Sequence, residues 1–427
     1  MPPAADPARS VDAGGDSRLV TKFYALQATR STGFVSPVFA LFVLRDVTFA
    51  EFGVLSAVLG VVVVGGEVPT GYVGDRYGRK TSLALSVAFT VVSLLGFVVA
   101  QGFVPYLLLY VLWAFALTFA SGSVDAWLYE LLEERLSADR YTTIRGRGAS
   151  VMRLTSVVTM VGGGALYVVD PVYPFLAAAA LSALGLVVLW SMPESRGGDT
   201  AGRGVERNRQ VGPREALEVV RHDLTAPPLR WLALYAGLFF AVVSAATSYV
   251  QPVAEAAVRD GLDAASVELL GTALPLGLLL GLLYASFTAV SAVASYYAGD
   301  VEARVGLSRT LLLVPLATAG LLVAPRFVPL LAFPMFVALK GSWALLFPMV
   351  SGRLNDGLGS TGRATALSAF SMLYQLAKVP LVLAAGVVAG GMGPTAATAL
   401  LGGVFLVGAT VAWAVGGPVA RPASETA

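Results

Sequence analysis

The chain has 427 residues, of which 56% are hydrophobic and only 13% are charged, well below the charged share of about 25% that soluble domains carry. Most of it is therefore expected to lie within a lipid bilayer. A net charge of +2 gives no indication of nucleic-acid binding, and the absence of cysteine excludes disulfides and thiolate metal sites.

Twelve apolar segments are predicted to span the membrane, because a hydrocarbon core of about 30 Å needs roughly 20 residues of helix. The first six spans are expected at residues 22–44, 50–73, 81–101, 105–131, 149–169 and 172–192. The second six are expected at residues 229–252, 274–298, 307–325, 328–352, 364–389 and 394–416. The chain thus divides into a disordered tail (1–18), an N-terminal six-helix bundle (19–192), a linker (193–228), a C-terminal six-helix bundle (229–417) and a second tail (418–427).

The linker at residues 193–228 is hydrophilic, with arginines interleaved with glutamates. A tether between the two bundles is the simpler interpretation. Residues 213–223 also have the apolar spacing of a helix that could lie on the inner membrane surface, where it would serve regulation or lipid binding.

Lysines and arginines collect on one side of the predicted membrane. On the side of both termini we count 22 of them, against 3 on the other side, namely Arg45, Arg259 and Arg326. Because cytoplasmic loops carry the excess of basic residues, both termini are expected in the cytoplasm of a multi-pass protein of the plasma or inner membrane.

The turn between the second and third spans is the most diagnostic segment of the chain. It reads Gly-Tyr-Val-Gly-Asp-Arg-Tyr-Gly-Arg-Lys from Gly71 to Lys80. Glycines let the chain turn tightly between helix ends, and the charges can interact with neighbouring helix termini. The pair Gly74-Asp75 recurs as Gly299-Asp300 in the equivalent loop of the second half, which indicates pseudo-symmetric halves.

This turn is similar to the loop signature Gly-x-x-x-Asp-Arg-x-Gly-Arg-Arg/Lys of the major facilitator superfamily of secondary transporters. The resemblance covers all predicted spans and implies an all-α membrane protein with twelve transmembrane helices in two pseudo-symmetric six-helix bundles. Segments 67–70, 121–130 and 363–368 resemble the efflux-type, drug/proton antiporter members. The gating residues that the resemblance implies are Gly71, Asp75, Arg76, Gly78, Arg79, Lys80, Glu130 and Arg363.

The resemblance also implies a latch on the cytoplasmic side. Asp75 is expected near the N-terminus of helix eleven close to Arg363, and Arg79 is expected to reach Glu130 at the inner end of helix four. A helix N-terminus favours an anion, and an Arg-carboxylate pair is strong yet reversible. The alternative is that these charges only orient the chain at the membrane surface.

Two features depart from the drug-export members of the family. Helix five contains Gly162, Gly163 and Gly164 without the usual proline, and Thr118 stands where an arginine usually precedes the glycine of helix four. Proton-driven drug export is therefore one interpretation and not an established one.

Charged residues inside predicted spans are candidates for function, because each costs several kcal/mol unless it is paired or faces water. Arg30, Glu67, Asp125 and Arg153 lie within about two to three helical turns of the predicted cytoplasmic face. They either neutralise one another, or Glu67 or Asp125 titrates during transport and couples it to protons.

Lys340 and Lys378 fall near the predicted midplane, where the second half has no carboxylate. They could bind an anionic group of the substrate, pair with Asp125, or be deprotonated. By resemblance, helices one, four, seven and ten line a central cavity. The predicted substrate-binding residues are Arg30, Asp125, Gln251, Lys340, Trp343 and Lys378.

The sequence therefore predicts a secondary transporter that moves a small organic solute by alternating access, as a monomer, with proton-coupled export. Proton-coupled uptake of an anionic metabolite is the first alternative, and a non-transporting sensor or scaffold of the same fold is the second. We expect no enzymatic activity, no cofactor and no metal. The charged residues inside the predicted spans, without His or Cys, make no convincing nucleophile, metal cluster or acid-base pair, and the chain has no nucleotide-binding loop. The expected partners are a small-molecule substrate, protons and the lipid bilayer.

Overall fold

The computed structural model of the protein describes residues 13–135, 140–194, 229–261, 268–269, 272–273, 275–356 and 363–415. The predicted tail at 418–427 and nearly all of the predicted linker lie outside these residues. The first half forms α1 (Ala13–Thr29), α2 (Phe39–Val43), α3 (Phe49–Tyr77), α4 (Arg79–Val99), α5 (Phe103–Ala120), α6 (Ser123–Arg135), α7 (Tyr141–Val169) and α8 (Tyr173–Trp190). The second half forms α10 (Arg230–Thr247), α11 (Val250–Gly261), β1 (Glu268–Leu269), β2 (Thr272–Ala273), α12 (Leu276–Tyr296), α13 (Ala298–Val305), α14 (Leu307–Val323), the 3-10 turns η3 (Ala324–Arg326) and η4 (Pro329–Leu331), α15 (Ala332–Asp356), α16 (Arg363–Met392) and α17 (Pro394–Val415).

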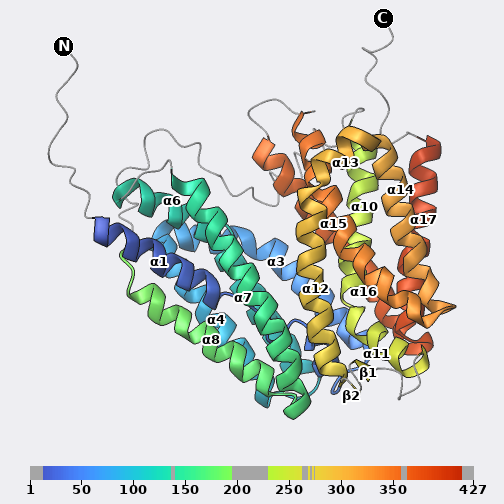
Figure 1. The fold of residues 1–427 in the computed structure, drawn as a ribbon, viewed down its shortest axis with the longest axis horizontal. Coiled ribbons are helices and arrows are strands. Elements are labelled where there is room, and N and C mark those ends of the chain that lie inside the picture. The colour runs from blue at the N-terminus through green and yellow to red at the C-terminus, as the bar shows by residue number, and fades with distance from the viewer. Residues whose placement is uncertain are drawn as a thin grey trace, which may run out of the picture.

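The helices form two bundles, one from each half of the chain (Figure 1). Helices α1 to α8 pack on one another in the first bundle, and α10 to α17 do so in the second. Between the bundles, α3 packs along α16 and α7 packs along α12. The predicted all-α fold is confirmed, and the two-residue strands β1 and β2 are the only strands in the described part of the chain.

The predicted first span, residues 22–44, is not one continuous helix. Among the described residues, eleven helices are long and apolar enough to cross a membrane, and this segment is not one of them, because it is divided into α1 and α2. Residues 30–38 between them form turns. Pro37 lacks a backbone donor and disfavours helix at the residue before it, and Gly33 is a weak helix former. Helix α1 also begins earlier than expected, at Ala13, within the predicted disordered tail.

Two further predicted spans are also interrupted by a short break in the helix. The fourth is divided into α5 and α6 at Ser121 and Gly122, where Gly122 has a φ of 68°, a conformation that suits glycine. The seventh is divided into α10 and α11 at Ser248 and Tyr249. Hydropathy averaged over a span does not detect such breaks, because the residues on both sides remain apolar.

The two ends of the molecule differ in how the bundles meet. We call the end with the turn at Gly78, helix α6 and helix α13 the charged end. The opposite end, with residues 44–48 and the turn at Gly393, is the closed end. In Figure 1 α6 and α13 lie toward the top, and β1 and β2 lie at the bottom.

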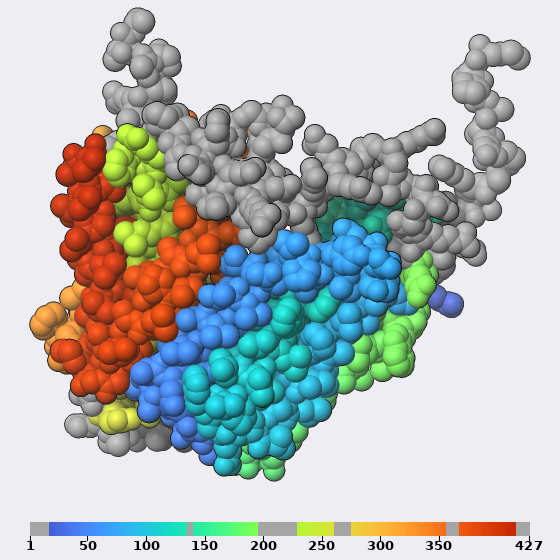
Figure 2. All heavy atoms as spheres, turned by 180° about the vertical axis from the view of Figure 1, so that it is seen from behind, coloured from blue at the N-terminus to red at the C-terminus, as the bar shows by residue number. Residues whose placement is uncertain are grey.

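At the closed end the bundles touch through glycine backbones. Gly53 of α3 lies against Gly386 of α16, and Gly164 of α7 lies against Gly277 and Gly281 of α12. Figure 2 shows α3, in blue, running directly alongside α16, in orange. Since glycine has no side chain, the helix axes can approach more closely than other residues allow.

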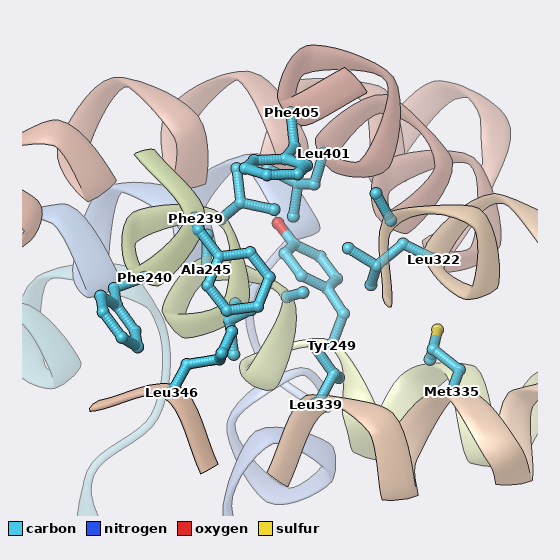
Figure 3. Close-up of a cluster of buried hydrophobic side chains, with 14 of the residues drawn as sticks. Phe239, Phe240, Ala245, Tyr249, Leu322, Met335, Leu339, Leu346, Leu401 and Phe405 are labelled. Carbon is cyan, nitrogen blue, oxygen red and sulfur yellow. The ribbon is translucent and has the colours of Figure 1, made fainter. Parts of the chain in front are cut away.

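The second bundle has a large core of aromatic and aliphatic side chains. Figure 3 shows Tyr249, from the break between α10 and α11, pointing toward Leu401 and Phe405 of α17. Its ring also packs against Phe49 and Phe52 of α3, with centroid distances of 6.5 and 6.4 Å. This residue therefore joins the core of one bundle to a helix of the other.

Candidate functional site

A cavity of about 620 Å³ lies between the two bundles, a size typical of sites for drug-sized ligands. The breaks in the first and seventh predicted spans contribute to its wall, because their turns bring polar residues to the middle of the molecule. Its serines and threonines are Thr32, Ser36, Ser56, Ser244, Thr247, Ser248 and Ser291. No Asp or Glu of the described chain lines it.

Aromatic rings form the apolar walls on both sides. In the first bundle, Phe39 packs against Phe97, Tyr110 and Trp113 at centroid distances of 5.3, 5.8 and 5.5 Å. All four of these rings line the cavity. In the second bundle, the cavity wall includes Trp343.

The indole of Trp343 is held in place from behind. Phe240 meets it edge-on at 4.8 Å, Tyr374 meets it edge-on at 5.5 Å, and Phe347 stacks on it at 6.1 Å. These three rings restrict the rotation of the indole, which lines the cavity.

Lys340 of α15 and Lys378 of α16 both line the cavity, as the sequence led us to expect for Lys340. Lys378 lies half-way along the 30-residue α16. Within the described chain, neither ammonium makes an ion pair or hydrogen bond, and no charged side chain acts on either. Pairing with Asp125, one of the three possibilities for these lysines, is not seen in this structure.

Gln251 lies at the closed-end side of the cavity and bridges the two bundles. Its Oε1 accepts hydrogen bonds from the backbone N–H groups of Ala40 and Leu41, at 2.7 and 3.2 Å. Its Nε2 donates to the carbonyl oxygen of Ser36 at 2.7 Å and to the hydroxyl of Tyr284 at 3.0 Å. These four bonds use the whole hydrogen-bonding capacity of the amide. The expected contact with substrate stays a prediction, since in this structure the side chain is engaged elsewhere.

The bonds of Gln251 also supply a helix cap. Ala40 and Leu41 are in the first turn of α2, where backbone N–H groups have no partner within the helix, and Val38 at the N-cap makes no side-chain bond. A residue of the second bundle therefore caps a helix of the first.

Arg30 and Asp125 do not line the cavity. Asp125 accepts two hydrogen bonds from Arg145 of α7, at 2.9 and 3.0 Å, and the charge of Asp125 also acts on Arg30. The Arg30 guanidinium donates to Gln27 at 2.9 Å. Asp125 is thus paired chiefly with Arg145, which is not one of the four residues grouped by the neutralising interpretation. That interpretation, and the contact of Arg30 and Asp125 with substrate, stay predictions.

Glu67 of α3 is half-buried and also lies outside the cavity wall. Ser121, at the break between α5 and α6, is 3.5 Å from its carboxylate, which is a weak contact. No Lys or Arg of the described chain forms an ion pair with it. Leu59, the last cavity-lining residue of α3, is eight residues earlier, which places Glu67 about 12 Å further toward the charged end.

The charged turn is held by its own residues. Gly78 has a φ of 93° and separates α3 from α4. Across it, Arg79 Nη2 lies 2.5 Å from Asp75 Oδ1, and the Asp75 side chain is 68% exposed. Arg76 donates to the hydroxyl of Tyr72 at 2.7 Å. Gly74 leaves room for the guanidinium, because a Cβ there would lie 3.1 Å from Arg79 Nη1.

The expected latch partners are placed as follows. Glu130 lies half-buried on α6, and Arg363 begins α16 with a side chain outside the described part. The predicted contacts of Asp75 with helix eleven and of Arg79 with Glu130 stay predictions. Lys80 instead donates to the carbonyl oxygen of Met192 at 2.7 Å, beyond the end of α8.

The equivalent loop of the second half repeats the turn. Gly306 has a φ of 84° and directly precedes α14, as Gly78 directly precedes α4. The glycine that matches Gly78 is thus 228 residues away, whereas Gly74-Asp75 and Gly299-Asp300 are 225 apart, because the segment before Gly306 is three residues longer.

A family model described as Major Facilitator Superfamily matches residues 25–379. The chain belongs to the major facilitator superfamily. This superfamily consists of membrane transporters and is not a class of enzymes, so the expectation of no enzymatic activity is confirmed. The resemblance to this superfamily, which the turn from Gly71 to Lys80 indicated, is confirmed as well.

One curated relative of this transporter is the uncharacterized MFS-type transporter YxaM of Bacillus subtilis (strain 168). It is 28% identical over 157 residues, which cover 36% of this chain and 38% of YxaM. The match thus spans little more than a third of either protein.

Solved structures share the fold of the transporter over nearly its whole length. A mutant of nucleoside transporter NupG has a TM-score of 0.76 at 13% identity, covering 93% of this chain and 99% of that chain. A bacterial homologue of the human lysosomal transporter Spinster, in an inward-facing and occupied conformation, has a TM-score of 0.65 at 15% identity, covering 96% of each chain. At these identities the likeness shows the fold alone.

Sequence reasoning missed several residues of the site. Arg145, the partner of Asp125, was assigned to a cytoplasmic loop, although the structure has it in the first turns of α7. The cavity rings of Phe39, Tyr110 and Trp113 lie in apolar runs, where an aromatic residue gives no signal of its own. Only the need of a carboxylate in a predicted span for a cation could have pointed to Arg145.

Proposed function

We propose that this transporter moves a small organic solute by alternating access, and that protons drive its export across the plasma or inner membrane. The cavity between the bundles is the observation that carries the proposal. It combines ring-lined walls, hydroxyls and charges at mid-depth, and it lies where the two bundles meet. A site in that position can face either side as the bundles rock.

The charged end is proposed to face the cytoplasm, because the excess of Lys and Arg lies in the loops of that end. The inter-bundle contacts described above all lie in the half of the molecule toward the closed end. At the charged end, Tyr77 and Tyr296 are 61% and 78% exposed. These observations support our proposal that the structure is a cytoplasm-facing state of the cycle.

The charged turn is proposed to exchange partners during that cycle. In the cytoplasm-facing state Asp75 and Arg79 bind each other. When the charged end closes, Asp75 approaches the N-terminus of α16, whose first-turn N–H groups favour an anion, and Arg79 reaches Glu130. The exposed position of Asp75 leaves it available for this change.

Vesicles that contain the purified transporter test the proposal. A pH gradient is imposed, and cationic, neutral and anionic organic solutes are screened for movement that collapses when the gradient is dissipated. We expect at least one solute to move against its own gradient in the direction opposite to protons. Movement with protons would support uptake in place of export, and no movement above protein-free vesicles for any solute would contradict the proposal.

Glu67 is the carboxylate that we expect to carry the proton. It lies inside the apolar part of α3 with no cation bound to it, whereas Asp125 is held by Arg145. The Glu67→Gln variant should lose accumulation driven by the pH gradient while still exchanging solute at equal pH. The matched variant Glu302→Gln, in the exposed part of α13, should keep both activities.

Asp125→Asn separates the two candidate carboxylates. If this variant loses gradient-driven accumulation and Glu67→Gln keeps it, Asp125 is the carrier. If both variants accumulate solute fully, neither carboxylate couples transport to protons.

A further inference from the structure

The charge of the cavity is one-sided. Lys340 and Lys378 are on neighbouring helices, α15 and α16, and both belong to the second bundle. Within the described chain neither has a counter-charge, and no carboxylate lines the cavity. An unpaired ammonium held away from water is costly, so two of them in one wall indicate a site that an anion completes.

The opposite wall has no charge and is aromatic. Phe39, Tyr110 and Trp113 of the first bundle form one packed group, and their rings border the same cavity. Trp343 lies three residues after Lys340 on α15, so its ring and the ammonium are on one face of the helix. A ring bound beside the anionic group would therefore meet aromatic surface on both sides.

We propose that the solute of this cavity is an organic anion with a planar aromatic group. Its oxyanion, a carboxylate or a group of similar chemistry, binds Lys340 and Lys378, and its ring packs between Trp113 and Trp343. This proposal rests on the proposed transport function and names the substrate class of the same cavity. The hydroxyl of Ser244, which also lines the cavity, can add a hydrogen bond to the oxyanion.

The same features disfavour the other classes of solute. A cation would meet two ammonium groups and no carboxylate. A neutral polyol would leave both ammonium groups unpaired, although ring stacking could hold it. A purely aliphatic anion would bind the lysines but gain less from the rings than a planar group does.

Binding to the purified protein tests the substrate class without transport. The probes are four: 2-naphthoate, the neutral 2-naphthamide, the cationic 2-naphthylmethylammonium and the aliphatic octanoate, followed by a panel of aromatic carboxylates, sulfonates and phosphates. Thermal stabilisation of the protein is measured for each. We expect aromatic anions to stabilise the protein and to bind at least tenfold more tightly than their neutral and cationic counterparts. Preference for a neutral or cationic probe, or no stabilisation by any aromatic anion, overturns the proposal.

Variants locate the anion. Lys340→Gln and Lys378→Gln should each weaken binding of the best aromatic anion at least tenfold. The control is Lys22→Gln, whose ammonium lies outside the cavity and donates to the carbonyl of Ser191, and which should leave that binding unchanged. Unchanged binding in both cavity variants overturns the assignment.

Loss of fold cannot imitate this result. Removing an unpaired charge should raise the melting temperature of the ligand-free protein, because no ion pair is broken. A folded, more stable Lys340→Gln protein that no longer binds the anion supports the proposal, and one that is less stable contradicts the absence of a partner on which it rests.

The ring contact has its own comparison. Trp113→Leu should weaken naphthoate binding several-fold and leave octanoate binding unchanged, whereas Trp190→Leu, at a side chain that is 76% exposed, should change neither. Equal loss for naphthoate and octanoate would show that no ring is recognised.

The outcome is separate from that of the transport proposal. Anion binding without gradient-driven movement in vesicles would refute transport and keep the substrate class. Gradient-driven movement of a cation would refute the substrate class and keep transport.

Discussion

Replacing Gln251 with leucine will open the closed end of the transporter. The substitution leaves the N–H groups of Ala40 and Leu41 and the carbonyl oxygen of Ser36 without their partner across the interface. A buried group left unpaired costs about 1–3 kcal/mol, whereas water satisfies it once that end opens. The equilibrium should therefore shift at least tenfold toward the state in which the bundles have separated at the closed end. Transport should slow by a similar factor.

Spin labels can report this shift directly, because the chain has no cysteine and any introduced cysteine is labelled alone. Arg45→Cys with Arg326→Cys measures the closed end, and Tyr77→Cys with Tyr296→Cys measures the charged end. In the Gln251→Leu background, the first distance should lengthen and the second should shorten.

Two further variants separate the effects of the individual hydrogen bonds that Gln251 makes. Gln251→Glu keeps an acceptor for Ala40 and Leu41 but loses the donor to Ser36, so its effect should be smaller than that of leucine if the cap of α2 dominates. Tyr284→Phe removes one bond and should have the mildest effect. Unchanged distances at both ends in Gln251→Leu would show that the amide does not hold the bundles together.

Gly386→Ala will have a comparable effect through packing. A Cβ at this position would lie 2.7 Å from the carbonyl oxygen of Phe49, a backbone atom of α3 that cannot move alone. Gly53, on the facing helix, has the same restriction, with its Cβ 2.7 Å from the carbonyl oxygen of Val382. Such overpacking costs about 1–3 kcal/mol, so the shut form of the closed end should lose about tenfold in population.

The helix itself does not suffer, since alanine favours helix over glycine by about 1 kcal/mol. Gly65→Ala on α3 is the matched control, because no atom lies within 4 Å of the Cβ that it adds. It should transport at the normal rate with unchanged distances. Normal transport by Gly386→Ala would show that α3 and α16 accommodate the added Cβ without a cost in free energy. Loss of transport in Gly65→Ala would make the comparison invalid.

The broad architecture could be predicted from the sequence because it follows from two regular signals. Runs of about 20 apolar residues place the helices, and the turn from Gly71 to Lys80 carries a specific family pattern. The resemblance to the family, in which helix ten lines the central cavity, also led us to expect Lys340 and Trp343 there, and both line the cavity.

The details of the site could not be predicted, because they depend on contacts between distant segments. Gln251 and Ala40 are 211 residues apart, and nothing in either segment indicates the bond between them. The division of residues 22–44 into two helices combines local turn preferences at Gly33 and Pro37 with hydrogen bonds of Ser31 with Ser156 and Thr159 of α7. The partner of Asp125 likewise comes from another helix, α7.

The cap that α2 borrows from the other bundle has a consequence for observing the protein at work. The amide protons of Ala40 and Leu41 are shielded from deuterium only while Gln251 accepts them. The rate of deuterium exchange in the peptide that contains these two residues therefore reports how often the closed end opens. The protein needs no label for this measurement and can be in a cell membrane or a vesicle.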